Sequence, residues 1–243
     1  MNVLSIGNSF SANAHALLPQ LLKEEGEEIL LCNLFIGGCS LERHWNNWRK
    51  EEQAYAYEVY LPGETVMNRP EGVALHEAVE DEDWDVITLQ QCSALSGVQE
   101  SYTPYLAELA AYCRMVQPGA RILLHQTWAY GAYCTAQAFQ TYHNDQEEMY
   151  RALAAAYAAA AEEAEITQII PTGTAFQLAR QTRVGDRLTS EDGMHASTAG
   201  EYLGAACFYE ALYGRSVPGH PWCPPALDPA WLPALQFSAH TAE

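Results

Sequence analysis

Apolar residues in this chain gather in short runs that alternate with stretches of helical periodicity. After the first run, leucines recur with the spacing of one helix face and predict a helix over residues 14–25. The runs that predict buried strands are residues 3–6, 29–35, 85–89, 121–125 and 166–170. Later helices are predicted over residues 102–116, 146–165 and 197–213. This alternation predicts a doubly wound α/β fold, in which a mostly parallel sheet of five strands lies between layers of helices.

Two segments depart from this rhythm. Residues 51–83 contain alternating apolar positions at 55–61 and a Pro-Gly turn, which predict a β-hairpin, and a short helix is expected at 72–79. The Pro- and Trp-rich segment 217–243 is expected to wrap the surface. Neither an internal repeat nor a linker divides the sequence, so we expect one domain over residues 1–243.

The chain carries a strong negative charge. Its 12 Lys and Arg against 31 Asp and Glu give a formal net charge of −19. A surface this acidic repels phosphate groups, which argues against nucleic acid or an anionic membrane as a partner. The longest alanine-rich run, residues 152–161, contains Tyr157 and is closed by two glutamates, which is typical of a soluble helix. No signal-peptide pattern opens the sequence, so a cytoplasmic protein is expected.

The cysteines and histidines do not have the spacing of a set of metal ligands. The 7 cysteines are scattered without a CxxC pair, so we expect reduced thiols rather than a zinc site or a disulfide framework. Cys39 and Cys92 are interpreted as small packing residues. His15, His125 and His143 lack the spacing of a metal site. The sequence therefore predicts neither a metal nor a cofactor.

Residues that follow each predicted strand are the candidates for chemistry, because doubly wound folds bind ligands at the carboxyl ends of their strands. Ser9 follows the first strand, at the expected start of a helix. Its hydroxyl can act as a nucleophile there, and its backbone N–H can stabilise an oxyanion. The alternative is that the serine only caps the helix.

A second candidate pair stands near the other end of the sequence. Asp192 comes three residues before His195, in a predicted loop ahead of the last helix. That spacing lets the carboxylate hold the imidazole in the tautomer that accepts a proton from serine, although a surface Asp and a capping His share the same pattern. Gly37-Gly38 follows the second strand. A glycine there either leaves its N–H open to an oxyanion or only forms the turn.

The order of these features resembles the SGNH hydrolases, also called GDSL-like esterases. The resemblance implies a flavodoxin-like three-layer α/β/α fold with Ser9 as nucleophile. It implies that Asp192 and His195 complete a catalytic triad and that Gly38 joins Ser9 in an oxyanion hole. Further motifs over residues 3–214 resemble the DUF4886 branch of this superfamily. They are G-N-S-F-S, G-G-x-S-L, Trp84-Asp85, Q-T-W-A-Y at 126–130 and D-G-M-H-A-S.

The superfamily's third motif, G-x-N-D, is absent. After the strand at residues 85–89 the sequence continues with Gln90-Gln91-Cys92-Ser93. The side-chain amide of Gln90 is our candidate to replace the missing asparagine as an oxyanion donor. Gln91 would point to the opposite face if the strand continued, so the choice between the two glutamines stays open.

The resemblance implies ester hydrolysis. No long apolar lid helix for a fatty acyl chain is evident, which favours a short acyl ester, with an O-acetyl group on a carbohydrate as the leading candidate. Trp128 and Tyr130 follow the fourth parallel strand and form either an aromatic platform for a sugar ring or part of the core. The alternative function is a catalytically weak or inactive carbohydrate-binding protein on the same fold. The sequence does not determine the oligomeric state.

Overall fold

A mixed β-sheet forms the centre of the molecule. The computed structural model describes residues 1–242, with the backbone alone for residues 64–71. Over this part of the chain the sheet has seven strands in the order β4-β3-β2-β1-β5-β6-β7. The strands are β1 (Asn2–Gly7), β2 (Leu30–Phe35), β3 (Tyr55–Leu61), β4 (Glu64–Val73), β5 (Val86–Leu89), β6 (Arg121–His125) and β7 (Ile169–Ile170). All five strands predicted from apolar runs are present and parallel to one another.

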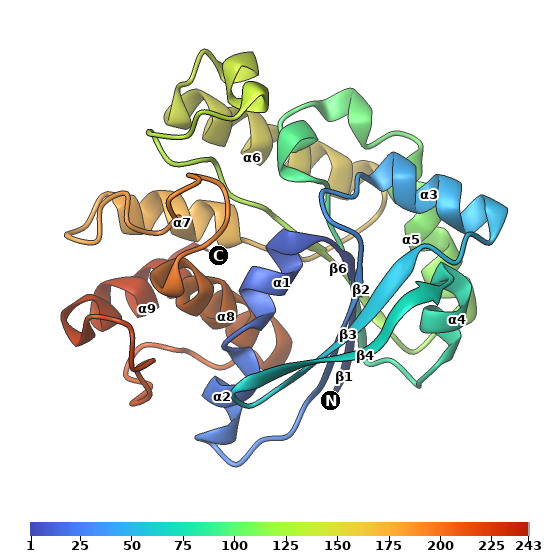
Figure 1. The fold of residues 1–243 in the computed structure, drawn as a ribbon, viewed down its shortest axis with the longest axis horizontal. Helices are drawn as coiled ribbons and strands as arrows, with labels where there is room; N and C mark the ends of the chain where they lie inside the picture. Colours follow the sequence, from blue (N-terminus) through green and yellow to red (C-terminus); the bar gives the residue numbers. More distant parts are fainter. Residues whose placement is uncertain (243) are drawn as a thin grey trace.

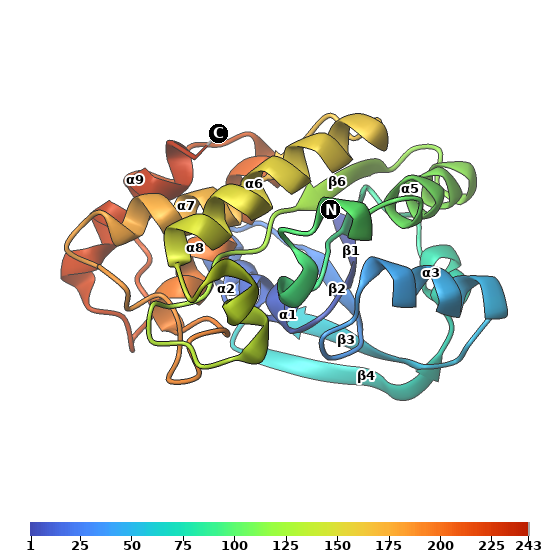
Figure 2. The ribbon, with the colours of Figure 1, turned by 90° about the horizontal axis from the view of Figure 1, so that it is seen from above.

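The predicted hairpin extends this sheet, and the expected total of five strands is therefore wrong. β3 pairs antiparallel with β2, with Tyr57 opposite Leu34, and β4 pairs antiparallel with β3. Tyr55 and Tyr57 are buried, because the period of two along a strand directs every second side chain to the same face. The hairpin thus supplies core residues and lies at one edge of the sheet (Figure 2).

Helices cover both faces of the sheet. Figure 1 shows α1, α2, α8 and α9 on one side and α3, α4 and α5 on the other. The helices are α1 (Ser9–His15), α2 (Leu18–Lys23), α3 (Leu41–Lys50), α4 (Leu75–Glu80), α5 (Tyr105–Val116), α6 (Gln146–Glu163), α7 (Thr172–Arg180), α8 (Thr198–Tyr213) and α9 (Leu232–His240). The resulting α/β/α layering is the predicted fold class. Within residues 1–242, no helix has both the length and the apolar character needed to cross a membrane.

Several helices differ from the prediction. The expected helix over residues 14–25 is two short helices, because Pro19 has no N–H to continue the hydrogen-bond ladder of α1 into α2. Helices α3, α7 and α9 were not predicted. The segment 217–243, expected only to wrap the surface, contains α9, whose Leu235 and Ala239 are buried where it packs on α8.

The five parallel strands bring their carboxyl ends to one edge of the sheet. Ser9 follows β1, Gly38 follows β2, and Gln90 follows β5. Since β2, β1 and β5 are neighbours in the sheet, residues separated by 81 positions in the sequence, from Ser9 to Gln90, come together. The candidate site therefore lies where such folds place their ligands.

Candidate active site

A serine, a histidine and an aspartate form a hydrogen-bonded line at this edge. The Oγ of Ser9 lies 3.0 Å from Nε2 of His195, and Nδ1 of His195 lies 2.6 Å from Oδ2 of Asp192. A carboxylate can only accept, so Nδ1 carries the proton and Nε2 is left to accept the hydroxyl proton of Ser9. This tautomer is the one that a general base for serine requires.

The carboxylate of Asp192 is held on both of its oxygens. While Oδ2 faces the imidazole, Oδ1 accepts hydrogen bonds from the Ser190 hydroxyl at 2.9 Å and from the N–H groups of Met194 and His195 at 2.7 and 3.0 Å. Partial burial acts to raise the pKa of Asp192, but the hydrogen bonds from the His195 ring and these donors hold that pKa well below its ordinary value. Asp192 is therefore ionised at neutral pH, with a fixed orientation.

The loop that carries His195 is anchored to the helix that carries Ser9. Thr189 and Ala196 form a β-bridge across the base of the loop. The N–H of Ala196 donates to Oδ1 of Asn13 on α1 at 3.0 Å. From the core side, the indole N–H of Trp128 donates to the carbonyl of Met194 at 2.9 Å. These contacts explain how residues 186 positions apart keep hydrogen-bond distance.

Asn8, which was not among the predicted site residues, joins three strand ends. As the N-cap of α1, its Oδ1 accepts from the N–H of Phe10 at 3.0 Å. Its Nδ2 donates to the carbonyl of Cys39, beside Gly38, at 3.1 Å, and its Oδ1 also accepts from Nε2 of Gln90 at 2.7 Å. An asparagine directly before a candidate helix start is a capping signal that could have identified this residue.

The backbone around Ser9 and Gly38, the two predicted oxyanion donors, can be described directly. Ser9 is the first residue of α1, where helix N–H groups have no partner within the helix, whereas the N–H of Phe10 is bound by Asn8. Gly38 has φ of +61°, which glycine adopts without strain, and no heavy atom lies within 4 Å of the point that a Cβ would occupy there. The turn after β2 thus leaves open space next to its backbone.

The two candidate glutamines have different surroundings. Gln91 is fully engaged away from Ser9: its Oε1 accepts from the N–H of Leu41 and Cys92, and its Nε2 donates to Ser101. Gln90 lies against Asn8, the residue before Ser9, and is 1% exposed. Of the two amides, only that of Gln90 contacts the turn that carries Ser9.

Trp128 and Tyr130 belong to the core, one of the two interpretations of their position. The Trp128 ring is 0% exposed and lies between Phe10 and Phe176, with ring centroids 4.3 and 4.5 Å away. Tyr130 is 2% exposed and its hydroxyl lies 2.9 Å from Oγ of Ser93. Neither ring presents a face to solvent. Trp128 instead packs on Phe10, next to Ser9, and donates a hydrogen bond to the loop that carries His195.

The other cysteines and histidines considered in the sequence analysis lie apart from Ser9, Asp192 and His195. Burial raises the pKa of the Cys39 thiol to about 12 and also raises the pKa of Cys92, so neither is a thiolate at neutral pH. His15 and His125 are 0% exposed, whereas His143 lies at the surface beside Glu148. In the described part of the chain, no group of three or more His, Cys, Asp or Glu residues is arranged to hold a metal ion.

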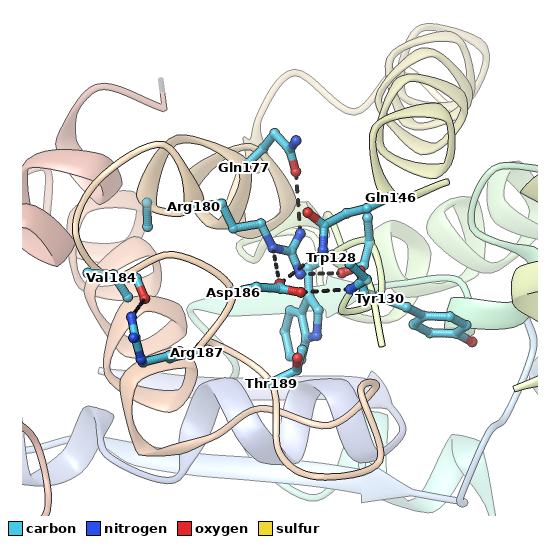
Figure 3. A network of polar contacts seen from close by, with 12 residues as sticks. Trp128, Tyr130, Gln146, Gln177, Arg180, Val184, Asp186, Arg187 and Thr189 are labelled. Atoms are coloured by element: carbon cyan, nitrogen blue, oxygen red, sulfur yellow. Dashed lines mark hydrogen bonds and ion pairs between the residues drawn. The ribbon is translucent and has the colours of Figure 1, made fainter. Parts of the chain in front are cut away.

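A partly buried ion pair joins the last residue of α7 to the segment that leads to Asp192, and both of its members also bind the loop after β6 (Figure 3). Nε of Arg180 lies 3.0 Å from Oδ1 of Asp186, and the guanidinium also donates to the carbonyl of Ala129 at 2.8 Å. Asp186 accepts further from Nε2 of Gln146 and from the N–H of Ala132. The arginine side chain is 5% exposed and that of the aspartate 28%. Sequence patterns did not reveal this pair.

Replacing Arg180 by methionine is expected to lower the free energy of unfolding by about 3 kcal/mol, because it leaves the partly buried carboxylate of Asp186 without its counter-charge and the carbonyl of Ala129 without its donor. Urea unfolding measures the change. The matched control is Arg151→Met: that arginine pairs with Glu147 on the surface, with its side chain 73% exposed, and its loss should cost below about 0.5 kcal/mol. Equal stability of the two variants would contradict the role assigned to the Arg180–Asp186 pair.

Comparisons with known proteins agree with this architecture. The family model described as "Domain of unknown function (DUF4886)" matches residues 2–242. A crystal structure of a DUF4886 family protein from Bacteroides uniformis is 40% identical, with a TM-score of 0.94, and the match covers 100% of this chain and 94% of that one. The comparison with curated proteins found no match.

More distant structures share the fold. A protein of Slackia heliotrinireducens assigned to the SGNH hydrolases is 22% identical, with a TM-score of 0.58 over 87% of this chain and 98% of that one. An acetyl xylan esterase is 14% identical, with a TM-score of 0.54 over 87% of this chain and 100% of that one. These likenesses establish the SGNH hydrolase fold. By the match over nearly its whole length, the chain belongs to the DUF4886 family.

Proposed function

We propose that this protein is a serine esterase that hydrolyses short acyl esters. The observation that carries the proposal is the hydrogen-bonded line from Ser9 through His195 to Asp192. The arrangement supports ester hydrolysis: hydrogen bonds keep the Asp192 carboxylate ionised, that carboxylate accepts from Nδ1 of His195, and Nε2 faces the hydroxyl of Ser9. The SGNH hydrolase fold of the chain agrees with this chemistry.

In the proposed mechanism, Oγ of Ser9 attacks the ester carbonyl carbon while Nε2 of His195 takes the hydroxyl proton. The N–H groups of Ser9 and Gly38 stabilise the resulting oxyanion, together with the second amide hydrogen of Gln90, the first being bound to Asn8. The carbon–oxygen bond to the alcohol then breaks, and His195 protonates the leaving oxygen. Water, deprotonated by His195, releases the acid and restores Ser9. Asp192 keeps the imidazole oriented throughout and stabilises its positive charge.

An acetyl ester of a carbohydrate is our candidate substrate. An open depression of about 570 Å³ lies beside the Asp192 loop and is lined by Tyr133, Asp186, Arg187, Thr189, Ser190 and Glu191. Hydroxyl, carboxylate and guanidinium groups of this kind bind sugar hydroxyls, and an exposed aromatic ring packs on a sugar face. Tyr133 is 47% exposed and takes the role that Trp128 and Tyr130, both buried, cannot fill. A fold neighbour, named as an acetyl xylan esterase, is compatible with this choice.

A series of aryl esters from acetyl to dodecanoyl tests the function and the acyl preference together. We expect kcat/KM to be highest for acetyl or propionyl and to fall with longer chains, because the depression is open and none of the residues that line it has a wholly apolar side chain to enclose a long acyl chain. A maximum of kcat/KM at acyl chains of about eight or more carbons, the length that lipases prefer, would contradict the short-acyl proposal. If no ester is hydrolysed and calorimetry detects glycan binding, the carbohydrate-binding alternative is favoured instead.

A further inference from the structure

A second line of hydrogen bonds runs beneath the site and ends at the turn that carries Ser9. Oγ1 of Thr172 lies 3.1 Å from Nε2 of His125, Nδ1 of His125 lies 2.7 Å from Oε1 of Gln90, and Nε2 of Gln90 lies 2.7 Å from Oδ1 of Asn8. Asn8 in turn donates to the carbonyl of Cys39 at 3.1 Å. None of these five residues is more than 1% exposed.

The directions of the hydrogen bonds from His125 to Gln90 and from Gln90 to Asn8 follow from one backbone group. The N–H of Phe10 donates to Asn8, so the atom it reaches must be the oxygen, Oδ1. The partner of that oxygen on Gln90 must then be the amide nitrogen, which leaves Oε1 of Gln90 to face His125. An oxygen accepts only from a protonated Nδ1.

The protonation state of the His125 ring determines the direction of the remaining hydrogen bond, between Thr172 and His125. Burial lowers the pKa of His125 to about 3, so the ring is neutral at physiological pH and Nε2 carries no proton. The hydroxyl of Thr172 therefore donates to Nε2. All donors point the same way, from Thr172 to Cys39, and hydrogen bonds aligned in this manner polarise and strengthen one another.

We infer that His125 is a positioning residue for the oxyanion hole, acting through Gln90 and Asn8. This inference rests on the proposed esterase function. The His125 ring fixes which way the Gln90 amide faces, and Gln90 and Asn8 together fix the turn of Ser9 against the carbonyl of Cys39, next to Gly38. Without the Nδ1–H donor, Oε1 of Gln90 is a buried acceptor with no partner, and the amide is free to turn toward a different one.

The chain offers a matched control in His15. Like His125, it is 0% exposed, and both rings pack edge-on against Phe208, at 5.1 and 4.8 Å. Burial, with a smaller contribution from His125, also lowers the pKa of His15 to about 3. Its Nε2, however, bonds to the hydroxyl of Ser5 on β1 at 3.0 Å rather than to Gln90. The His15→Phe and His125→Phe variants thus remove similar buried rings with different partners.

The experiment measures kcat and KM on an acetyl ester and the affinity for a small boronic acid, which forms a tetrahedral adduct with serine and occupies the oxyanion hole. For His125→Phe we expect kcat and boronate affinity to fall together, by about 10- to 100-fold, with KM within about threefold, because the loss is confined to the transition state. His15→Phe should lose thermal stability but keep both values within about twofold. His125→Asn retains an N–H donor for Gln90 and should recover most of the loss.

Two results would overturn the inference while leaving the esterase intact. One is a His125→Phe variant that is folded and as active as His15→Phe. The other is a nitrogen-15 NMR spectrum of the wild type in which His125 is protonated on Nε2, since the hydrogen-bond line requires Nδ1–H. A wild-type protein that hydrolyses no ester and binds no boronate would instead reject the proposed function, and the positioning role with it.

Discussion

Ser9→Ala is expected to lower kcat/KM for ester hydrolysis by about 10⁴-fold or more, because the variant has no oxygen to form the acyl-enzyme. The hydroxyl of Ser9 contacts His195, whereas the side chain that caps helix α1 is that of Asn8, which the variant keeps. The melting temperature should therefore change by less than about 2 °C, which corresponds to under 1 kcal/mol for a chain of this size.

Fluorophosphonate labelling and intact-protein mass spectrometry separate this role from an indirect one. The wild type should gain a single adduct, and the Ser9→Ala variant none. Ser11→Ala is the matched control, since Ser11 follows closely on α1 and its hydroxyl is directed to Asn8 and Asn33 rather than to His195; it should still be labelled. Retained turnover in Ser9→Ala, or an adduct on both alanine variants, would reject Ser9 as the nucleophile.

Acid should destabilise this protein well above the pH at which carboxylates titrate. His15, His44 and His125 are each 0% exposed, and burial lowers the pKa of each ring from 6.5 to about 3. Below pH 6.5 the unfolded chain takes up protons that the folded chain excludes. The stabilising contribution of the neutral rings is thus complete above pH 6.5 and is lost as the pH falls toward 3. From pH 7 to pH 5 the free energy of unfolding should fall by about 2 kcal/mol for each ring, about 6 kcal/mol in all.

Urea unfolding at the two pH values measures this change. His15→Phe should lose about a third of the pH effect, because one of the three titrating rings is gone. His143→Gln should keep all of it, since the His143 side chain is 81% exposed. Equal stability of the wild type at pH 7 and pH 5 would show that the three rings are accessible to protons in the folded state.

Local spacing explains what could be predicted from the sequence. Asp192 and His195 lie in one loop, so their separation of three positions reflects their separation in space. Ser9 became a candidate by its place after an apolar run, and the resemblance to the SGNH hydrolases assigned it as nucleophile. The structure places it just after β1, as the first residue of α1. Parallel strands also require their carboxyl ends to meet, which is why the sequence could bring Ser9, Gly38 and Gln90 to one edge.

Contacts between distant segments explain what could not be predicted. Asn8 meets Cys39 and Gln90, which are 31 and 82 positions away, and no local pattern encodes either contact. Trp128 follows a strand at the correct edge, yet it turns inward because Phe10 and Phe176 enclose it. Similarly, the alternating pattern of residues 55–61 indicated a strand but not the strand with which it pairs. That β3 joins the sheet by pairing with β2 could therefore not be predicted.

The hairpin has a consequence for how the molecule opens. With β4, β3 and β2 on one side and β5, β6 and β7 on the other, β1 is the middle strand of the sheet. Local fraying begins at edges, where strands have a single neighbour, and the middle strand separates last. The amide hydrogens of β1 should be among the slowest in the protein to exchange with solvent. The turn that presents Ser9 is thus attached directly to the strand that we expect to open last.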